Sequence, residues 1–223
     1  MITSRSNATL KLVRKLASRR WRDKLGLFFA EGEDLVDAAR AAGVEPAELL
    51  VAGENVEPRL LAEVSSLAHP PRVVGVFRRA DLPAGPLPET GLSLWRVADP
   101  GNVGTLVRAA DAFGPAFVAL SGGCADPTGP KALRATAGAI FRVPLARFED
   151  APRPWIALLA REGCALAAVA AGGATFVLGS ERLGLPPEVV GSCDERASIP
   201  IAATAESLNV ALAGAIALYE RRR

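Results

Sequence analysis

Residues 92–221 alternate short apolar runs with longer stretches of helical character, and this alternation limits the possible folds more than any other feature. Strands are expected over residues 92–98, 116–121, 142–147, 165–170, 175–179 and 196–201. Helices are expected over residues 102–113, 130–140, 152–162 and 206–221, with a helical turn over 187–191. Strands that alternate with helices form parallel sheets with helices on both faces. The pattern therefore predicts a doubly wound, Rossmann-like α/β domain, in which ligands bind beyond the carboxyl ends of the strands.

The first part of the chain has a shorter version of the same pattern. Helices are expected over residues 10–20, 34–42 and 59–67, and strands over residues 27–29, 49–51 and 73–77. A segment with three prolines and two glycines follows, which is typical of a linker. We therefore predict a small α/β domain over residues 1–79, a linker over 80–91 and a second domain over 92–223.

Composition excludes several classes of protein. The net charge of +2 and the 50% hydrophobic content are typical of a soluble globular protein. No apolar stretch is long enough to span a bilayer and the N-terminus has no hydrophobic signal core, so we expect a cytoplasmic protein. Cys124, Cys164 and Cys193 are isolated and His69 is the only histidine. This argues against a metal site, a disulfide framework and a Ser-His-Asp or Cys-His catalytic unit.

Basic residues are concentrated near the N-terminus. From Arg5 to Lys24 the chain has eight lysines and arginines against the single acid Asp23. A helix from about Leu10 would bury a stripe of Leu12, Val13, Leu16 and Ala17. Most of the charges would then lie on its outer face, namely Lys11, Arg14, Lys15, Arg19 and Arg22. Such a face is either solvated or follows nucleic-acid phosphates, and the charge run alone leaves both open.

Polar residues follow two of the expected strands near the C-terminus. Gly179-Ser180-Glu181 comes after one strand and Ile199-Pro200 ends another. The expected helix that follows has Ser207 and Asn209 in its first turn, where side-chain oxygens and free backbone N–H groups gather. Taken alone, helix capping by Glu206 or Ser207 accounts for this cluster.

A second polar group lies upstream. Asp99 to Gly101 has turn chemistry, and Asn102 begins a helix that stops at Gly114. The six residues from Asn102 to Arg108 turn the helix by about 600°, so the two side chains point to different sides. Arg108 is either a surface residue or a charge at a cleft or subunit boundary. The sequence lacks a G-x-G-x-x-G fingerprint and a Walker A lysine, which disfavours an NAD enzyme and a phosphate cradle.

In this order and spacing, the two groups resemble the three motifs of the SpoU (TrmH-like) RNA ribose 2′-O-methyltransferases of the SPOUT superfamily. Asn102 with Arg108 matches the first motif. The second is matched by Gly179-Ser180-Glu181 with Gly184-Leu185, and the third by Ile199-Pro200 through Ser207-Leu208-Asn209-Val210. Residues 130–139 are similar to the lysine-arginine helix that precedes a Phe-x-x-Pro strand, here Phe141 to Pro144. The resemblance covers residues 92–220 closely and 4–78 more loosely, and three motifs in register are specific.

The resemblance implies an S-adenosylmethionine-dependent enzyme with a deep trefoil knot, which is an exception to the rule that chains do not knot. It assigns the methyl donor to Gly179, Ile199 and Leu208, and catalysis to Arg108 with Asn102, Glu181, Ser207 and Asn209. The candidate RNA-binding residues are Arg5, Lys11, Arg14, Lys15, Arg19, Lys131 and Arg134. It also implies a homodimer through the knot domain.

Several alternatives stay open at this point. The N-terminal domain favours ribosomal RNA over transfer RNA as the substrate. Methylation that protects the ribosome against an antibiotic is one variant of this function. A catalytically silent RNA-binding member of the fold is a further possibility, but all five catalytic candidates are present. Glu181 either accepts the proton or orients Arg108. The family's second motif usually has glycine after the glutamate, where this chain has Arg182, and a left-handed backbone there would be strained by arginine.

Overall fold

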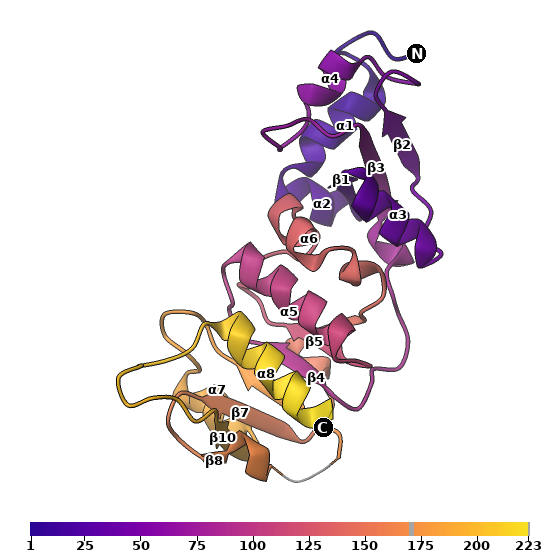
Figure 1. Cartoon of the computed structure of the whole chain (residues 1–223). Helices are drawn as coiled ribbons and strands as arrows, with labels where there is room; N and C mark the ends of the chain where they lie inside the picture. The colour runs from indigo at the N-terminus through magenta and orange to yellow at the C-terminus, as the bar shows by residue number, and fades with distance from the viewer. Residues whose placement is uncertain (170–171, 223) are drawn as a thin grey trace.

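The computed structural model describes residues 1–169 and 172–222, and its larger unit is built on a parallel sheet (Figure 1). Within the described residues this sheet has seven strands in the order β6-β5-β4-β9-β7-β10-β8. All of its pairings are parallel. The strands are β4 (Gly91–Leu94), β5 (Phe117–Leu120), β6 (Leu145–Arg147), β7 (Trp155–Leu159), β8 (Cys164–Ala165), β9 (Thr175–Leu178) and β10 (Glu195–Ser198). The predicted parallel α/β sheet is confirmed, whereas the knot stays a prediction.

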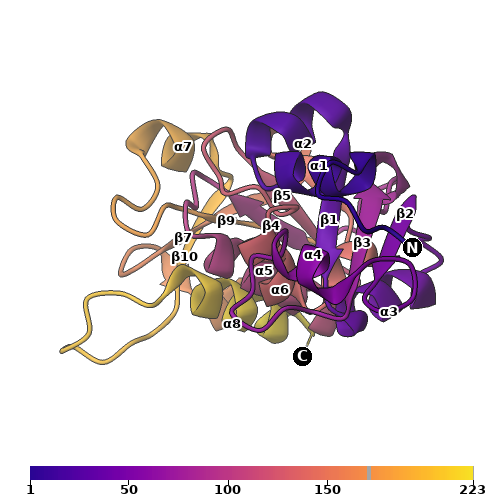
Figure 2. The same ribbon diagram turned by 90° about the horizontal axis from the view of Figure 1, so that it is seen from above.

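Helices α5 (Pro100–Ala112) and α8 (Val210–Arg222) pack side by side on one face of this sheet (Figure 1). They run in parallel, because Asn209 bonds Asn102 at their N-terminal ends and Arg222 bonds the Ala112 carbonyl at their C-terminal ends. A Cβ at Gly214 would lie 2.3 Å from the Leu106 side chain, so glycine is what permits this close packing. Helix α7 (Pro187–Ser192) lies on the opposite side of the molecule (Figure 2).

The N-terminal unit is a three-stranded antiparallel sheet with helices around it. Its strands β1 (Leu27–Glu31), β2 (Glu48–Val51) and β3 (Val73–Arg78) pair in the order β1-β3-β2. The helices are α1 (Ala8–Leu16), α2 (Arg19–Leu25), α3 (Glu33–Ala41) and α4 (Pro58–Ala62). One face of the sheet buries Phe29, Leu50 and Val74 against α1 and α4.

The two units share a hydrophobic core. Phe28 and Phe77 of the N-terminal sheet pack on Phe141, with ring centroids 6.2 and 5.2 Å away. Phe141 belongs to the segment that follows helix α6 (Pro130–Thr136). Because these rings and their neighbours form one continuous buried cluster, the N-terminal unit is held against the larger sheet. The boundaries at residues 79 and 91 stay a prediction.

Buried ion pairs cross the same boundary. Asp126, in the β5–α6 loop, accepts hydrogen bonds from Arg22 Nε and Arg79 Nη2, both at 2.8 Å. Arg22 Nη1 also donates to the carbonyls of Leu16 and Ala17, so the buried guanidinium is both paired and hydrogen-bonded. Buried charges are tolerated only when they are paired in this way. The contact fixes α2 against the larger unit.

Several sequence predictions were wrong. Residues 152–162 contain strand β7 in place of a helix, and the expected helix over residues 10–20 is two helices that break at Ala17 and Ser18. Arg22 was expected on the outer face and is buried, whereas Ala17 was expected inside and is exposed. The expected strand 165–170 is β8 followed by a short 3-10 helix, and its residue 170 lies outside the described residues.

The remaining differences are shifts of element ends. The C-terminal helix begins at Val210, four residues after the predicted start, and helix 59–67 is the shorter α4. Helix 130–140 ends at Thr136 and continues as a separate 3-10 turn. No helix in the described part of the chain has the length and apolar character to cross a membrane.

Candidate active site

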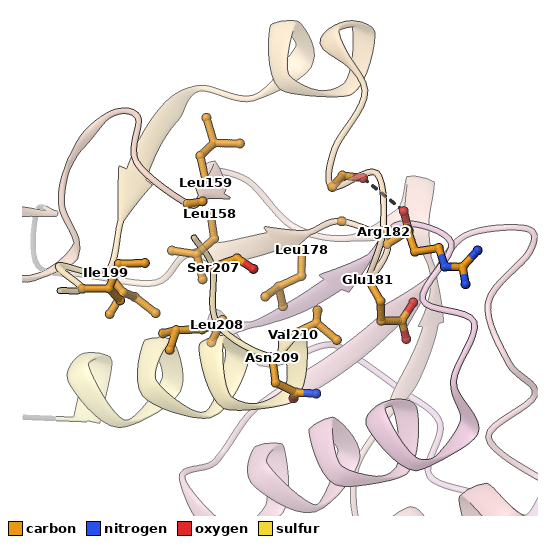
Figure 3. Close-up of a pocket in the computed structure, with 16 residues that line it drawn as sticks. Leu158, Leu159, Leu178, Glu181, Arg182, Ile199, Ser207, Leu208, Asn209 and Val210 are labelled. Atoms are coloured by element: carbon orange, nitrogen blue, oxygen red, sulfur yellow. Dashed lines mark hydrogen bonds between the residues drawn. The ribbon is translucent and has the colours of Figure 1, made fainter. Parts of the chain in front are cut away.

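A cavity of 500 Å³ opens beyond the carboxyl ends of β7, β9 and β10, against the start of α8 (Figure 3). Its wall is largely apolar. The lining residues are Leu158, Leu159, Ala160, Leu178, Gly179, Ser180, Glu181, Arg182, Gly184, Ile199, Ile201, Ser207, Leu208, Asn209, Val210 and Ala213. The structure thus brings together all three candidate cofactor residues and three of the five catalytic candidates. The cavity lies where an open parallel sheet binds its ligands.

The loop after β9 forms one wall of this cavity. Ser180 and Gly184 exchange two backbone hydrogen bonds, of 3.1 and 3.0 Å, which close the loop on itself. A Cβ at Gly179 would lie 2.1 Å from the Gly184 carbonyl carbon, so only glycine fits there. The left-handed residue of the loop is Gly184, with a φ of 66°, and Arg182 has no positive φ. The strain expected at Arg182 is therefore absent, and its guanidinium extends away from the apolar wall (Figure 3).

Three polar side chains at the rim form a hydrogen-bonded chain. Asn209 Nδ2 donates to Asn102 Oδ1 at 3.1 Å, and Asn102 Nδ2 donates to Glu181 Oε1 at 3.0 Å. Asn209 also caps α8, because its Oδ1 accepts from the amides of Ala211 and Leu212. The cap is therefore Asn209, and the capping that the sequence suggested for Glu206 or Ser207 is wrong. The network joins the first, second and third sequence motifs.

Glu181 holds the loop between β4 and α5. Its two carboxylate oxygens accept the backbone N–H groups of Ala98 and Asp99 at 3.1 and 3.0 Å, besides the Asn102 side chain. Burial alone would raise the pKa of Glu181, but the hydrogen bonds from Asn102, Asp99 and Ala98 outweigh it and lower the pKa. Glu181 is therefore a fixed anion at neutral pH.

Asp99 and Lys131 complete this side of the rim. Asp99 caps α5 by accepting the Asn102 amide at 3.0 Å, and Lys131 Nζ lies 3.0 Å from its other oxygen. The hydrogen bond from Lys131 lowers the pKa of Asp99, and the bond from the Asn102 amide adds to this. Lys131, a candidate for RNA binding, is thus paired within the chain.

Arg108 lies apart from this network. It is exposed on α5, does not line the cavity, and makes no hydrogen bond or ion pair with any residue that the structure describes. Glu181 bonds Asn102 and the Ala98 and Asp99 amides and does not pair with Arg108 in this chain, so its alternative role of orienting Arg108 has no contact here. Arg108, the one cationic catalytic candidate, is therefore exposed and separate from the bonded rim.

The candidate RNA-binding residues differ in how far they are neutralised. Arg5 and Arg14 both pair with Glu63, and Arg134 donates to Ser66 and lies 3.7 Å from buried Glu31. Arg19 donates to the Cys124 carbonyl at 2.9 Å. Lys11 and Lys15 are exposed, and Lys15 lies over the Trp21 ring at 4.9 Å. Of the five cations predicted on the outer face, Lys11, Arg14, Lys15 and Arg19 are exposed and Arg22 alone is buried.

Part of the cavity wall was missed from the sequence. Leu158, Leu159 and Ala160 line it, but they lie in the segment that was predicted to be helical. The proline pair before this run and Gly163 after it were the available signals of a strand, since prolines and glycines bound strands. Ile201, two residues after the predicted Ile199, was also missed, although strand-like alternation places both on one side.

Comparison with known proteins identifies the family. Residues 90–219 match the model of the SpoU rRNA Methylase family, and residues 7–78 match the MRM3-like substrate binding domain. An uncharacterized tRNA/rRNA methyltransferase of Synechocystis is 30% identical, over 100% of this chain and 93% of the relative. The 23S rRNA (guanosine(2553)-2′-O)-methyltransferase RlmP of Bacillus subtilis is also 30% identical, over 99% of this chain and 98% of the relative.

A solved structure supports the same family assignment as the two relatives. The AdoMet-bound rRNA methyltransferase of Sinorhizobium meliloti superposes with a TM-score of 0.87 at 29% identity, and the match covers 100% of this chain and 97% of that one. The family model spans more than half of the chain, and the two relatives match it end to end. The chain therefore belongs to the SpoU rRNA methylase family.

Proposed function

We propose that this protein transfers a methyl group from S-adenosylmethionine to a ribose 2′-hydroxyl in structured RNA, and that ribosomal RNA is its substrate. The observation that carries the proposal is the hydrogen-bonded chain from Asn209 through Asn102 to Glu181 at the rim of an apolar cavity. The named function of the Bacillus subtilis relative and the bound AdoMet in the Sinorhizobium meliloti structure support it.

The cavity suits the methyl donor. Its volume of 500 Å³ lies in the range of small-molecule sites, about 300–1,000 Å³. Leu158, Leu178 and Leu208 offer an apolar slot for the adenine ring, and the strand ends at Gly179 and Ile199 offer backbone donors and acceptors. When bound, S-adenosylmethionine supplies a methyl group that is already activated by its sulfonium. Gly179, Ile199 and Leu208 are the residues proposed to hold it.

The chemistry requires a 2′-oxygen aligned with that methyl group and loss of the hydroxyl proton. Glu181 is a poor base because its pKa is lowered and both of its oxygens are engaged, so we assign it to positioning the β4–α5 loop. Arg108 is always protonated and is suited to stabilise the developing negative charge on the 2′-oxygen and to hold a phosphate. Ser207 and Asn209 orient the ribose from the rim. As the bond between the 2′-oxygen and the methyl group forms, the bond from the methyl group to sulfur breaks, and the hydroxyl proton is released to solvent water.

The position of Arg108 supports a homodimer. Helix α8 exposes the apolar side chains Leu212, Ile216 and Tyr219, with exposed fractions of 57%, 37% and 50%, and their spacing places them on one face. Arg108 is exposed on the adjacent helix α5. A second copy packed on this face would bury the apolar stripe and place Arg108 of one protomer at the partner's cavity.

Equilibrium sedimentation tests the dimer. We expect the wild type to sediment with twice the chain mass, and Leu212→Glu/Ile216→Glu to sediment as a monomer that has lost methyl transfer. A wild-type protein with a monomer mass at all concentrations would refute the dimer.

A methyl-mapping experiment tests the function. Total RNA from cells with and without the gene is mapped for 2′-O-methyl groups, and the purified protein is assayed on the unmodified RNA with labelled S-adenosylmethionine. We expect one ribosomal RNA site to lose its methyl group and to be restored in vitro. Loss of a transfer RNA methyl group would overturn the ribosomal assignment, and binding of RNA without transfer would identify a catalytically silent protein. The cytoplasm remains the proposed location.

A further inference from the structure

The turn after β5 exposes two glycines whose backbone N–H groups lack partners in the described part of the chain. We call residues Ser121–Cys124 the diglycine turn. Ser121 donates its amide to the Leu94 carbonyl and Cys124 donates to the Ser121 carbonyl, but the amides of Gly122 and Gly123 find no acceptor among the described residues. Gly123 is left-handed, with a φ of 93°. Successive N–H groups in such a turn form a concavity that binds anions.

Three arginines surround the diglycine turn. Arg19 donates to the Cys124 carbonyl at 2.9 Å, and Arg147 lines the same 400 Å³ cavity as Arg19 and Gly122. The Arg96 side chain packs over the turn, because a Cβ at Gly123 would lie 3.3 Å from its Cγ. Free amides and guanidinium groups are the two kinds of donor that bind phosphate. The three arginines come from α2, from the loop after β4 and from β6.

Arg96 has an uncommon backbone conformation. Its φ is 51°, in the left-handed region that side chains other than glycine rarely adopt. Ser121 Oγ accepts the Arg96 amide at 2.9 Å, and the guanidinium lies 5.6 Å from the centre of the Trp95 ring. Strain of this kind is concentrated at functional positions. Arg96 is exposed and pairs with no carboxylate in the described part of the chain.

The nearby carboxylates leave the arginines available. Glu149, which also lines the cavity, lies 3.6 Å from Arg147, and Asp23 lies 3.6 Å from Arg19. Both pairs are exposed, and such pairs contribute little energy. A phosphate that bonds the two free amides can therefore compete for the arginines. Gly122 also has open space where a Cβ would be, so a ligand can approach its backbone closely.

The diglycine turn contacts both the basic helices that the sequence predicts to bind RNA and the loop beside the proposed active site. Arg19 connects it to the basic helices α1 and α2, which lie on the side opposite α8 (Figure 2). Arg96 connects it to the loop whose Ala98 and Asp99 amides bind Glu181. Resting on the proposed function, we propose that the diglycine turn with Arg19, Arg96 and Arg147 binds a backbone phosphate of the substrate RNA, between its contacts with α1 and α2 and the nucleotide in the active site.

A paired charge removal tests the site. The double variant Arg96→Gln/Arg147→Gln is compared with Arg40→Gln/Arg72→Gln, which loses the same charge from exposed arginines in weak ion pairs elsewhere. RNA affinity is measured by filter binding over a range of salt concentrations. We expect the first variant to bind RNA about 10- to 100-fold more weakly, with the log–log salt slope reduced by about 0.7–0.9 per lost phosphate contact. The control variant keeps the wild-type affinity.

Three further measurements separate this proposal from its alternatives. Gly122→Asp, which has room for its side chain, should weaken RNA binding by at least the same factor, and Arg96→Lys should restore most of the loss. At saturating RNA, kcat and S-adenosylmethionine affinity should match the wild type. Unchanged affinity and slope in the arginine variant, or an equal loss in the control, would overturn the phosphate site. A wild type that transfers no methyl group would overturn the proposed function instead.

Discussion

Two regions of the molecule hold their polar side chains differently: in one they bond to one another, and in the other no carboxylate of the described residues neutralises them. The cavity rim is the first region, because Asn209, Asn102 and Glu181 bond in series. Arg108 and Arg96 belong to the second, since both are exposed and neither forms an ion pair with any described residue. Bonded groups are already positioned before a ligand arrives, which is what a fixed site requires. The unpaired cations are the groups that a polyanion can still engage.

This contrast predicts different consequences of mutation. Removing a bonded group should lower the free energy of unfolding. Removing an unpaired cation should reduce RNA binding or methyl transfer and leave the free energy of unfolding unchanged. The following variants separate the two.

Arg108→Ala should have the largest effect, and on catalysis only. If Arg108 stabilises the developing charge at the 2′-oxygen, its loss should lower kcat by about 10³-fold, or about 4 kcal/mol of transition-state energy. The thermal unfolding midpoint and the affinity for S-adenosylmethionine should not change, because Arg108 is exposed and unbonded. Single-turnover methyl transfer to RNA is the measurement. Full activity in this variant would remove Arg108 from the mechanism.

Asp126→Asn should have the largest effect on stability. It leaves Arg22, which is 5% exposed, with an unneutralised charge between the two units. Breaking a buried pair costs about 3 kcal/mol. Asp111→Asn is the matched control, because its pair with Arg142 is partly exposed and should cost under about 1 kcal/mol. Urea unfolding measures both variants, and equal losses would show that burial of the pair is irrelevant.

The same carboxylate predicts a pH dependence. Burial opposes ionisation of Asp126, but the hydrogen bond from Thr128 and the charges of Arg79 and Arg22 lower its pKa. A carboxyl group whose pKa is lower in the folded state stabilises the fold above its unfolded value, about 3.9. That stabilisation is lost as the pH falls through the folded value. Below about pH 4, the free energy of unfolding should therefore fall more steeply in the wild type than in Asp126→Asn.

Asn102→Ala sharpens the comparison, because Asn102 is both bonded and part of the proposed site. The variant removes a donor to Glu181 and an acceptor for Asn209, and should lower the free energy of unfolding by about 2 kcal/mol. It should also weaken S-adenosylmethionine binding by about tenfold, as the rim loses its order. Thr105→Ala, on the exposed face of the same helix, is the control and should change neither quantity. Loss of activity without loss of stability would place Asn102 with the unpaired group.

The sequence contained the motifs and most of the sheet, but the segments it misassigned have a common physical cause. The run from Trp155 to Leu159 is apolar without period, and a strand buried on both faces of a parallel sheet looks the same as a buried helix. Its alanine and leucine content favoured the helix. Three lining residues of the cavity were lost with it. Only the pairing of this strand with β9 and β10 decides its conformation.

The bonded rim itself could not be read from the sequence. Asn102 and Asn209 are 107 residues apart, and their contact depends on α5 and α8 packing in parallel. Spacing within a motif gives the direction of a side chain around its own helix, which is why Arg108 was correctly separated from Asn102. It gives no distance between motifs. The partners of Arg22 and Arg134 were missed for the same reason, since both lie across the boundary between the units.

Ser93→Ala should have the smallest effect on the free energy of unfolding, and should raise it where Asp126→Asn and Asn102→Ala lower it. Ser93 is fully buried on β4, and its Oγ is the one buried side-chain oxygen or nitrogen without a hydrogen-bond partner among the described residues. Replacing it with alanine removes an unsatisfied polar atom, so the free energy of unfolding should stay the same or rise by up to about 1 kcal/mol.

Thr175→Val is the matched control for Ser93→Ala. Thr175 is equally buried on the adjacent strand β9, but its hydroxyl donates to the Pro152 carbonyl. The valine variant would leave that carbonyl unpaired and should lose about 1–2 kcal/mol. If both variants lost stability equally, burial would matter more than bonding, and the division of this protein's polar residues by their partners would lose its predictive value. Opposite signs would extend that division from the active-site rim to the centre of the sheet.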